Sequence, residues 1–244
     1  MASFSTLPLT DLAAALTLGD HELVSLVGGG GKTTALFALG RQLPGSVLLT
    51  TTTKMGRSRT GGYPVLVGAD DEALGDALAD GGRVLVWGGG EDEKALGIAP
   101  EACDRWFAAG HNVVVEADGS RRKPFKAPRP YEPVLPSGTT FLVACVGAAA
   151  LDAPIDEGCQ RPELVAGLVG CGEGDPLTPD RLATVLTSPR GSAKDRPAGA
   201  RFAVVINQAT DHHAVFLEEL AARLGPEVPL SAVRPFGPGE SPEG

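Results

Sequence analysis

The chain has 244 residues, of which 43% are hydrophobic and 21% are charged, values that are ordinary for a globular protein with one sizeable core and argue against a largely disordered chain. Its formal net charge of −9 and its pI near 4.9 argue against a general nucleic-acid binder, because an acidic surface repels phosphate groups. The longest apolar runs, such as residues 141–146, are far shorter than the roughly 20 residues that span a membrane. We therefore expect neither a nucleic-acid partner nor a membrane.

The cysteines and the N-terminus indicate a compartment. Cys103, Cys145, Cys159 and Cys171 show no Cys-x-x-Cys spacing, which argues against a zinc knuckle because zinc sites usually draw pairs of ligands from short turns. Met1 is followed by polar and mildly apolar residues rather than by a charged segment and a long apolar one. We expect a cytoplasmic protein with reduced thiols.

The first half of the chain alternates short, β-branched apolar segments with stretches of helical pattern. The apolar segments are typical of buried strands and lie at residues 23–27, 46–51, 64–67, 83–87 and 111–116. The helical patterns lie at residues 9–18, 33–43, 71–78 and 101–109. Thr10 is the candidate N-cap of the first helix, and Pro44 and Gly45 end the second.

The second half is less regular. A cationic, proline-rich loop over residues 118–137 interrupts the pattern, and so long a connection inside a compact domain is more often functional than idle. We expect strands at residues 140–146 and 201–206, and helices at residues 161–169, 179–186 and 212–224. Thr178 and Pro179 suit the N-cap and first position of the helix at residues 179–186. Residues 189–199 are polar and predict a mobile surface loop, and residues 236–244 predict a flexible tail.

This order of elements predicts the fold class. Helical stretches of about ten residues that separate short, non-alternating apolar strands indicate a mostly parallel sheet with helices on both faces. We expect a single α/β domain over residues 1–235, of the kind found in P-loop NTPases.

A glycine-rich loop follows the first expected strand. Gly28, Gly29, Gly30 and Gly31 precede Lys32, Thr33 and Thr34, and a helical segment follows, which is the context of a phosphate-binding loop. In such loops the glycines let the backbone wrap around phosphate oxygens, the lysine neutralises the terminal phosphates, and the hydroxyl binds magnesium. Glycine is abundant here, at 33 of 244 residues, so the prediction of nucleotide binding depends on Lys32, Thr33 and the flanking elements.

The loop departs from the usual pattern at one position. Leu26 stands where the longer pattern has its first glycine. The remaining spacing, G-x-x-G-K-T, is similar to the compact loop of ATP-dependent Mur-type ligases.

Two acids follow the strand at residues 111–116. Glu116 and Asp118 would lie on the same side of an extended strand, because side-chain directions alternate along it. An acid at the end of a neighbouring strand usually completes a magnesium–nucleotide site. We therefore predict that Thr33 holds Mg²⁺ together with Glu116 or Asp118. The alternative is an ordinary strand end with solvated acids.

The strand at residues 46–51 runs into a series of threonines and Lys54. If the sheet is parallel, this strand ends on the edge where the phosphate loop lies, and Lys54 would be a second cation near the reacting phosphate. Alternatively, the threonines only pack and form hydrogen bonds at the strand edge. The candidate catalytic residues are Lys32, Lys54, Glu116 and Asp118.

Asn207 ends the last clear strand, where GTPases use Asn-Lys-x-Asp to hold guanine. Here Gln208 replaces the lysine, Thr210 replaces the aspartate, and Asp211 comes one place late. Asn207 is a candidate nucleotide-binding residue, but ATP and GTP both remain open.

Five sequence blocks together resemble the YqeC family, described as accessory proteins of selenium-dependent molybdenum hydroxylases. The blocks are VGGGGKTT, TTTTKM, VEADGSRRKPFKAP, RPELV with the later GDPLTPDRL, and VINQAT. The resemblance runs from about residue 23 to 233, and the VEADGSRRKPFKAP block beside TTTTK is its most specific part. Gln208 and Gln160 stand where the family commonly has a lysine and a histidine.

This resemblance implies a P-loop protein that uses ATP or GTP with Mg²⁺ to help mature a labile, selenium-bearing molybdenum cofactor. It also implies partners, namely an anionic cofactor precursor or selenium donor and a molybdenum hydroxylase. Carried over by position, substrate binding or coupling falls to Arg121, Arg122, Lys126, Arg161 and Glu163, while Glu163 could instead simply favour the start of a helix.

The loop at residues 118–137 carries five of the 21 cations of the chain within nine residues that contain no acid. Such a cluster could bind an anionic second substrate, because planar guanidinium groups match phosphate oxygens. It could also be a solubilising or partner-docking surface.

Three functions remain open at this point. The first is an NTPase or NTP-dependent transferase in cofactor maturation. The second is a Mur-like ATP-dependent ligase or kinase that acts on a small molecule. The third is a nucleotide-gated binding module without turnover, whose loops become ordered when the nucleotide binds.

Overall fold

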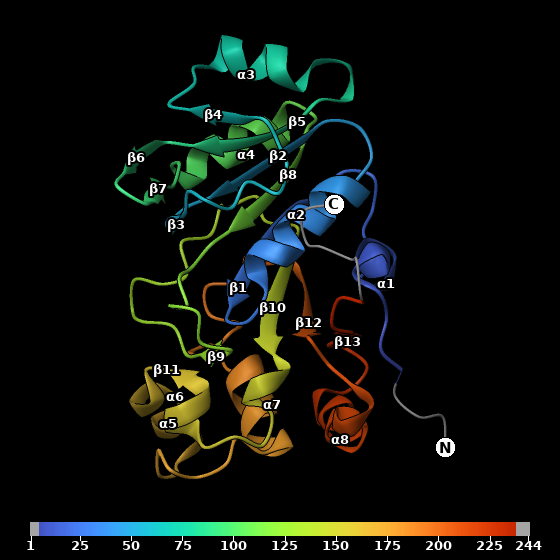
Figure 1. The fold of residues 1–244 in the computed structure, drawn as a ribbon, viewed down its shortest axis with the longest axis vertical. Coiled ribbons are helices and arrows are strands. Elements are labelled where there is room, and N and C mark those ends of the chain that lie inside the picture. Colours follow the sequence, from blue (N-terminus) through green and yellow to red (C-terminus); the bar gives the residue numbers. More distant parts are fainter. Residues whose placement is uncertain (1–4, 238–244) are drawn as a thin grey trace.

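In the computed structural model, which describes residues 5–237, eight strands form one sheet in the order β13-β12-β10-β1-β8-β2-β5-β4 (Figure 1). Each adjacent pair is parallel. The strands are β1 (Leu23–Gly28), β2 (Val47–Thr51), β4 (Val65–Val67), β5 (Arg83–Trp87), β8 (Asn112–Glu116), β10 (Phe141–Gly147), β12 (Arg201–Asn207) and β13 (Leu230–Val233). The predicted parallel α/β fold is confirmed, and β1, the strand that leads into the glycine-rich loop, lies near the centre of the sheet.

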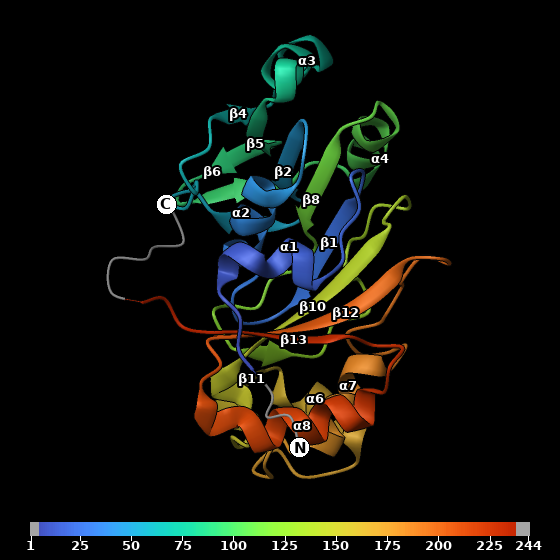
Figure 2. The ribbon, with the colours of Figure 1, turned by 90° about the vertical axis from the view of Figure 1, so that its right-hand side faces the viewer.

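Helices cover both faces of this sheet (Figure 2). Along β1, Val24 and Leu26 pack in the cluster formed by α1 (Leu12–Ala15) and α2 (Lys32–Gln42). Leu23 packs in the cluster of α3 (Asp71–Leu78) and α4 (Pro100–Ala108), and Val27 in that of α7 (Pro179–Thr187) and α8 (Ala214–Leu224). Because alternate residues of a strand face opposite sides, both sides of the sheet are buried, which explains the continuous apolar strands.

Smaller elements complete the fold. They are β3 (Lys54–Gly56), β6 (Gly89–Glu91), β7 (Lys94–Leu96), β9 (Phe125–Lys126), β11 (Cys159–Gln160), α5 (Ile155–Gly158), α6 (Pro162–Val169) and the 3₁₀ turns η1 (Leu9–Asp11), η2 (Ala79–Gly81), η3 (Ala148–Ala150) and η4 (Asp211–His213). Strands β3, β7 and β6 form an antiparallel sheet, and β9 pairs with β11 in parallel. These strands and β13 escaped prediction because two to four residues are too few to show a period.

The first helix is shorter than predicted. The segment expected at residues 9–18 divides into η1 and α1, and α1 ends at Ala15 because Thr17 adopts a left-handed φ of 52°. The prediction of Thr10 as N-cap is wrong. Thr10 lies inside η1, Pro8 precedes that turn, and the Thr10 hydroxyl donates to Asp11.

The segment at residues 189–199 also differs from its prediction. Gly191 and Ser192 are buried, the Ser192 N–H donates to the Val185 carbonyl at 2.9 Å, and Lys194 Nζ donates to the Glu132 carbonyl at 2.8 Å. The expectation of a mobile surface loop is therefore wrong for the centre of this segment, which packs against α7 and the cationic loop.

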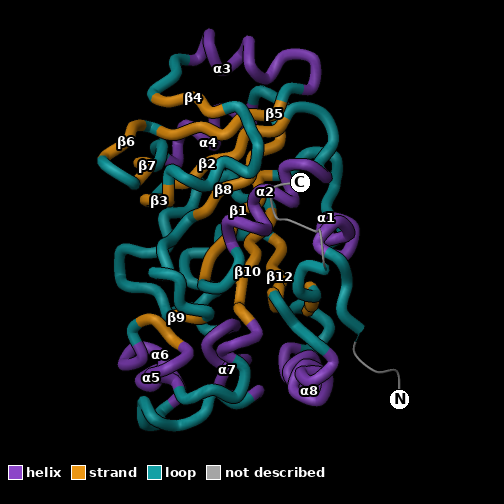
Figure 3. The backbone as a smooth tube through the Cα atoms, viewed as in Figure 1, coloured by secondary structure: helices purple, strands orange, loops and turns teal. Residues whose placement is uncertain are grey.

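The cationic loop follows β8. Figure 3 shows the connection from β8 to β10 as loop interrupted by β9, which lies beside α5 and α6. The pairing of β9 with β11 anchors the loop. Within the described residues, no helix combines the length and apolar character that a bilayer crossing needs.

Candidate functional site

The glycine-rich loop joins the end of β1 to the start of α2. Gly28, Gly30 and Gly31 have φ values of 94°, 67° and 95°, a region that residues with a side chain rarely adopt. A Cβ at Gly30 would lie 2.2 Å from the nitrogen of Gly147, and one at Gly29 would lie 2.5 Å from a carbonyl oxygen of the cationic loop. The sequence therefore needs glycine here for both conformation and space, as in a phosphate-binding loop.

Lys32 is buried at the first position of α2. Its Nζ donates to the Gly28 carbonyl at 2.5 Å and lies 3.2 Å from Asp118 Oδ1 and 3.8 Å from Glu116 Oε1. Burial lowers the pKa of Lys32, but the charges of Asp118 and Glu116 outweigh it, so the pKa lies above its ordinary value. The side chain is thus an ammonium group that faces the inside of the loop.

Thr33 and Glu116 meet beside Lys32. The Thr33 hydroxyl donates to Glu116 Oε2 at 2.8 Å. Burial raises the pKa of Glu116, while Lys32 and the Thr33 hydroxyl oppose that rise. A hydroxyl and a carboxylate in contact at the helix start fit a magnesium ion, which takes few protein ligands and completes its shell with water and phosphates. Among the residues described, no group of three or more His, Cys, Asp or Glu side chains could hold a metal ion by itself.

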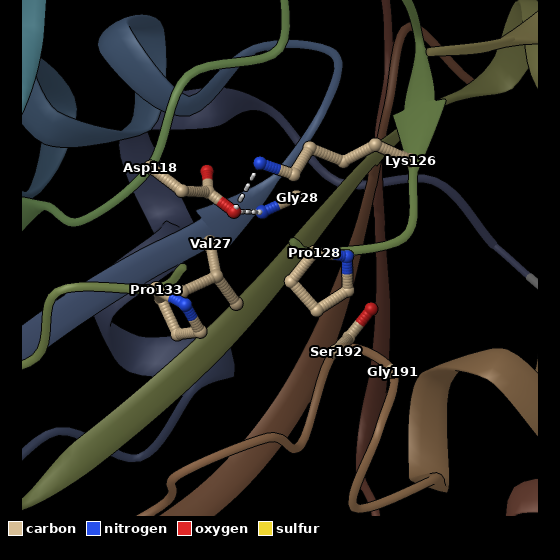
Figure 4. Close-up of a pocket in the computed structure, with 8 residues that line it drawn as sticks. All are labelled: Val27, Gly28, Asp118, Lys126, Pro128, Pro133, Gly191 and Ser192. Carbon is tan, nitrogen blue, oxygen red and sulfur yellow. Dashed lines mark hydrogen bonds and ion pairs between the residues drawn. The ribbon is translucent and has the colours of Figure 1, made fainter. Parts of the chain in front are cut away.

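Asp118 links the loop to a buried series of charges, shown in part in Figure 4. Its Oδ2 accepts from the Gly28 N–H at 3.0 Å and lies 3.1 Å from Lys126 Nζ. Lys126 also pairs with Glu132 at 2.8 Å, and Glu132 accepts two hydrogen bonds from Arg161, at 2.8 and 3.1 Å. We call Lys32, Asp118, Lys126, Glu132 and Arg161 the ion-pair relay.

Glu132 is the member of the relay that sequence reasoning missed. Burial alone would raise its pKa, but the hydrogen bonds from Arg161 and Lys126 hold the pKa at about 2. Lys126 is only 1% exposed, so Lys126 and Arg161 serve this network rather than present free charges. The one signal for Glu132 in the sequence is its position as the only acid between residues 119 and 137.

The remaining cations of the cationic loop point in several directions. Lys123 Nζ donates to the Glu157 carbonyl, and the exposed Arg129 donates to the Tyr131 hydroxyl. Arg121 and Arg122 are exposed and both left-handed, with φ values of 49° and 65°. Of the five cations, Lys126 is the one with an ion pair to Asp118 among the described contacts.

A cavity of about 300 Å³ opens beside the glycine-rich loop. Three arginines, Arg59, Arg122 and Arg234, contribute to it, and no acid is among the described residues around it. The lining comprises Leu9, Gly30, Gly31, Thr34, Arg59, Arg122, Pro124, Gly147, Ala149, Asn207, Gln208, Val233, Arg234 and Phe236. Phe236 was expected in the tail, whose residues 238–244 lie outside the described part. Arg59 was missed, although it follows the threonine run closely.

Asn207 ties the end of β12 to the loop. Its Nδ2 donates to the Gly30 carbonyl at 2.7 Å, and its side chain fills the space that a Cβ at Gly31 would need. Asn207 therefore shapes the loop, and its neighbour Gln208, with a left-handed φ of 62°, lines the same cavity.

Two other candidate residues, Lys54 and Glu163, do not line the cavity beside the glycine-rich loop. Lys54 is exposed in β3, part of the small antiparallel sheet. The threonines before it have structural hydrogen bonds, from Thr51 to the Glu116 carbonyl and from Thr52 to the Val134 carbonyl. Glu163 lies in the first turn of α6, away from the loop cavity, and lines a second cavity.

Comparisons with known proteins agree with the resemblance in the motifs. The family model described as "YqeC protein" matches residues 24–163. An "Uncharacterized protein YqeC" from Escherichia coli (strain K12) is 32% identical over 195 residues, which cover 76% of this chain and 75% of that protein. No solved structure matches the chain.

Proposed function

This chain belongs to the YqeC family, and we propose that it binds ATP or GTP with Mg²⁺ at the loop between β1 and α2 and hydrolyses it. One observation carries this proposal: a glycine-rich loop, the buried Lys32 and a cavity occur side by side. Three arginines and no acid line that cavity among the described residues. From the resemblance in the motifs, we further propose an accessory role in maturing a selenium-containing molybdenum cofactor or its hydroxylase.

The charges around the loop support an anionic ligand. Backbone N–H groups at the start of a helix and the helix dipole attract phosphate oxygens. Arg59, Arg122 and Arg234 add positive charge around the adjoining cavity, whereas the chain as a whole carries −9. A local cation cluster on an acidic protein concentrates phosphate groups at one place.

Backbone strain supports the same location. Arg122 and Gln208 line the cavity and both are left-handed although neither is glycine. Residues held in such conformations cost roughly 1–3 kcal/mol each and concentrate at ligand sites. The fold therefore keeps two strained backbone positions, Arg122 and Gln208, beside this cavity.

The roles of the residues follow from phosphoryl-transfer chemistry, which depends on positioning and charge neutralisation. Lys32 would exchange the Gly28 carbonyl for a phosphate oxygen while Asp118 and Glu116 keep it protonated. Thr33 and Glu116 would hold Mg²⁺, which supplies further charge neutralisation when bound. Asp118 would orient the attacking water or second substrate.

The release of inorganic phosphate from ATP and GTP tests the hydrolysis. We expect slow, magnesium-dependent release that Lys32→Ala abolishes and that Lys94→Ala, an exposed lysine on β7, leaves unchanged. Both variants are assayed with and without a molybdenum hydroxylase and a selenium donor. If neither nucleotide is hydrolysed under any of these conditions, the hydrolytic part of the proposal is wrong.

A second candidate function is an ATP-dependent small-molecule ligase or kinase. The compact G-x-x-G-K-T spacing and the second cavity, lined by Glu163, favour it. ADP release that requires a small-molecule substrate would distinguish this function from plain hydrolysis. Tight nucleotide binding without turnover, together with nucleotide-dependent capture of the hydroxylase, would instead indicate a binding module.

A further inference from the structure

We propose that the cavity between α6, residues 127–130 and residues 190–194 binds an organic anion with an apolar body, such as an aromatic phosphate or carboxylate. This anion would be the second ligand of the nucleotide-dependent reaction. This inference rests on the proposed function for its role in a reaction. The binding site itself is argued from the cavity.

The size and lining of the cavity suit a small molecule. Its volume of about 420 Å³ falls in the range of roughly 300–1,000 Å³ that is typical of ligand pockets. Its lining combines apolar residues, here called the floor, with three cations and one acid, here called the rim. The lining comprises Ala127, Pro128, Arg129, Pro130, Glu163, Leu164, Gly167, Leu168, Arg190 and Lys194.

Two of the rim cations are available to a ligand. Arg190 is exposed, and its guanidinium has no hydrogen bond or ion pair to the described part of the chain. Arg129 is exposed, and among the described contacts its guanidinium donates to the Tyr131 hydroxyl and lies over the Tyr131 ring. Lys194 is engaged with the Pro130 and Glu132 carbonyls, so it fixes the wall of the cavity. Paired guanidiniums recognise the oxygens of a phosphate or carboxylate.

The apolar floor selects the rest of the ligand. Pro128, Pro130, Leu164 and Leu168 present hydrocarbon surface, and Gly167 leaves open space at the surface of α6, where an added Cβ would meet nothing within 4 Å. Burying apolar area on this floor stabilises a ring system more than a bare inorganic anion. The combination of floor and rim therefore fits an organic anion with an apolar body.

A smaller cavity shares one wall with this cavity and touches the phosphate loop. Pro128 also lines a water-sized cavity of about 10 Å³, whose other walls include Gly28, Asp118 and Ser192. Figure 4 shows Asp118 and Lys126 on one side of this space and the Ser192 hydroxyl directed toward Pro128. Pro128 thus forms a wall common to the larger cavity and to the small space that Asp118 lines.

The cavity beside the glycine-rich loop, here called the nucleotide cavity, shares no described lining residue with the proposed cavity for the second ligand. The nucleotide cavity touches the loop at Gly30 and Gly31, whereas the water-sized cavity touches it at Gly28. In addition, the ion-pair relay ends at Arg161, the N-cap of α6, two residues before Glu163. Because the two cavities have separate linings, both ligands can be present together.

Calorimetric titration with 1-naphthyl phosphate tests the site, using the full chain with and without a non-hydrolysable ATP or GTP analogue and Mg²⁺. We expect the probe to bind in both cases and 1-naphthol, which lacks the anion, to bind at least tenfold more weakly. Arg190→Glu should weaken probe binding roughly tenfold or more, since hydrogen bonds to charged groups have about that effect. Arg105→Glu, an exposed arginine on α4, is its control.

A second variant fills the cavity without disturbing the core. Gly167→Leu places a side chain in open space on α6 and should weaken the probe at least tenfold. Gly75→Leu makes the same change on α3, also where an added Cβ meets nothing within 4 Å, and should have no effect.

Three results would overturn the inference: no probe binding, displacement of the probe by the nucleotide analogue, or equal affinity in Gly167→Leu and Gly75→Leu. Equal binding of 1-naphthol would overturn the anion specificity. Failure of the proposed function is a separate result. If the nucleotide analogue does not bind but the probe binds with the expected variant effects, the site stands and the nucleotide assignment falls.

Discussion

Glu132→Gln should destabilise the protein markedly, because Glu132 is the buried anion between Lys126 and Arg161. Its pKa is lowered from 4.5 to about 2, and this shift corresponds to roughly 3 kcal/mol of folding free energy. Glutamine keeps the shape of the side chain but removes the negative charge that neutralises Lys126 and Arg161. The expected loss agrees with the roughly 3–5 kcal/mol that breaking a buried ion pair costs. For a chain of this size, we expect a Tm lower by about 6–12 °C at pH 7.

The pH dependence gives this prediction a sign. A carboxyl group whose pKa is depressed in the folded state stabilises the fold above its unfolded pKa, and this contribution is lost as the pH falls from 4.5 toward 2. Denaturant titrations at pH 7, 5.5, 4.5 and 3.5 should therefore show a constant difference between wild type and Glu132→Gln above pH 5.5. Below that pH, the difference should shrink.

A surface pair provides the control for this experiment. Asp180→Asn breaks the exposed pair with Arg223 and should change stability little, because solvent screens such pairs. The reasoning is refuted if Glu132→Gln costs less than about 1 kcal/mol at pH 7, well below the cost of breaking a buried pair, or if its cost does not change with pH.

Three further predictions concern the loop and the thiols. Gly30→Ala should reduce nucleotide affinity at least tenfold in calorimetry, because its Cβ would lie 2.2 Å from the backbone of β10; unchanged affinity would refute the tight-loop geometry. Thr33→Val should remove most of the gain in nucleotide affinity that Mg²⁺ provides while binding without Mg²⁺ stays the same, because it removes the hydroxyl beside Glu116. Of the four cysteines, Cys171 alone should react with iodoacetamide at pH 8 in the native protein, because the other three thiols are buried and burial raises the pKa of Cys145 to about 12. Mass spectrometry measures this labelling, and labelling of Cys145 would contradict the prediction.

Much of the fold and part of the site follow from local sequence pattern. The strands β1, β2, β5, β8, β10 and β12 were predicted to within one or two residues, because each is a continuous apolar run buried on both faces. Period-two geometry also predicts that Glu116 and Asp118 face the same way, and both lie within 4 Å of Lys32 Nζ. Local periodicity determined both results.

The interior of the cationic loop did not follow from the sequence. A run of arginines, lysines and prolines indicates an exposed surface, yet Lys126 is buried because Asp118 and Glu132 neutralise it. Glu132 lies in an irregular segment with no period, and its partner Arg161 is 29 residues away. Such long-range pairing leaves no local signature. For the same reason Arg59 and Phe236 could not be assigned to the cavity beside the glycine-rich loop.

Calorimetric titration of the purified full chain with ATP and with GTP, each with Mg²⁺, tests the central claim most directly. We predict saturable binding of at least one nucleotide with one site per chain, weakened roughly 10- to 100-fold by Lys32→Ala and unchanged by Lys94→Ala. The absence of binding by either nucleotide to the folded wild-type protein, or equal affinity in Lys32→Ala, would contradict the assignment of the loop between β1 and α2 as a nucleotide site.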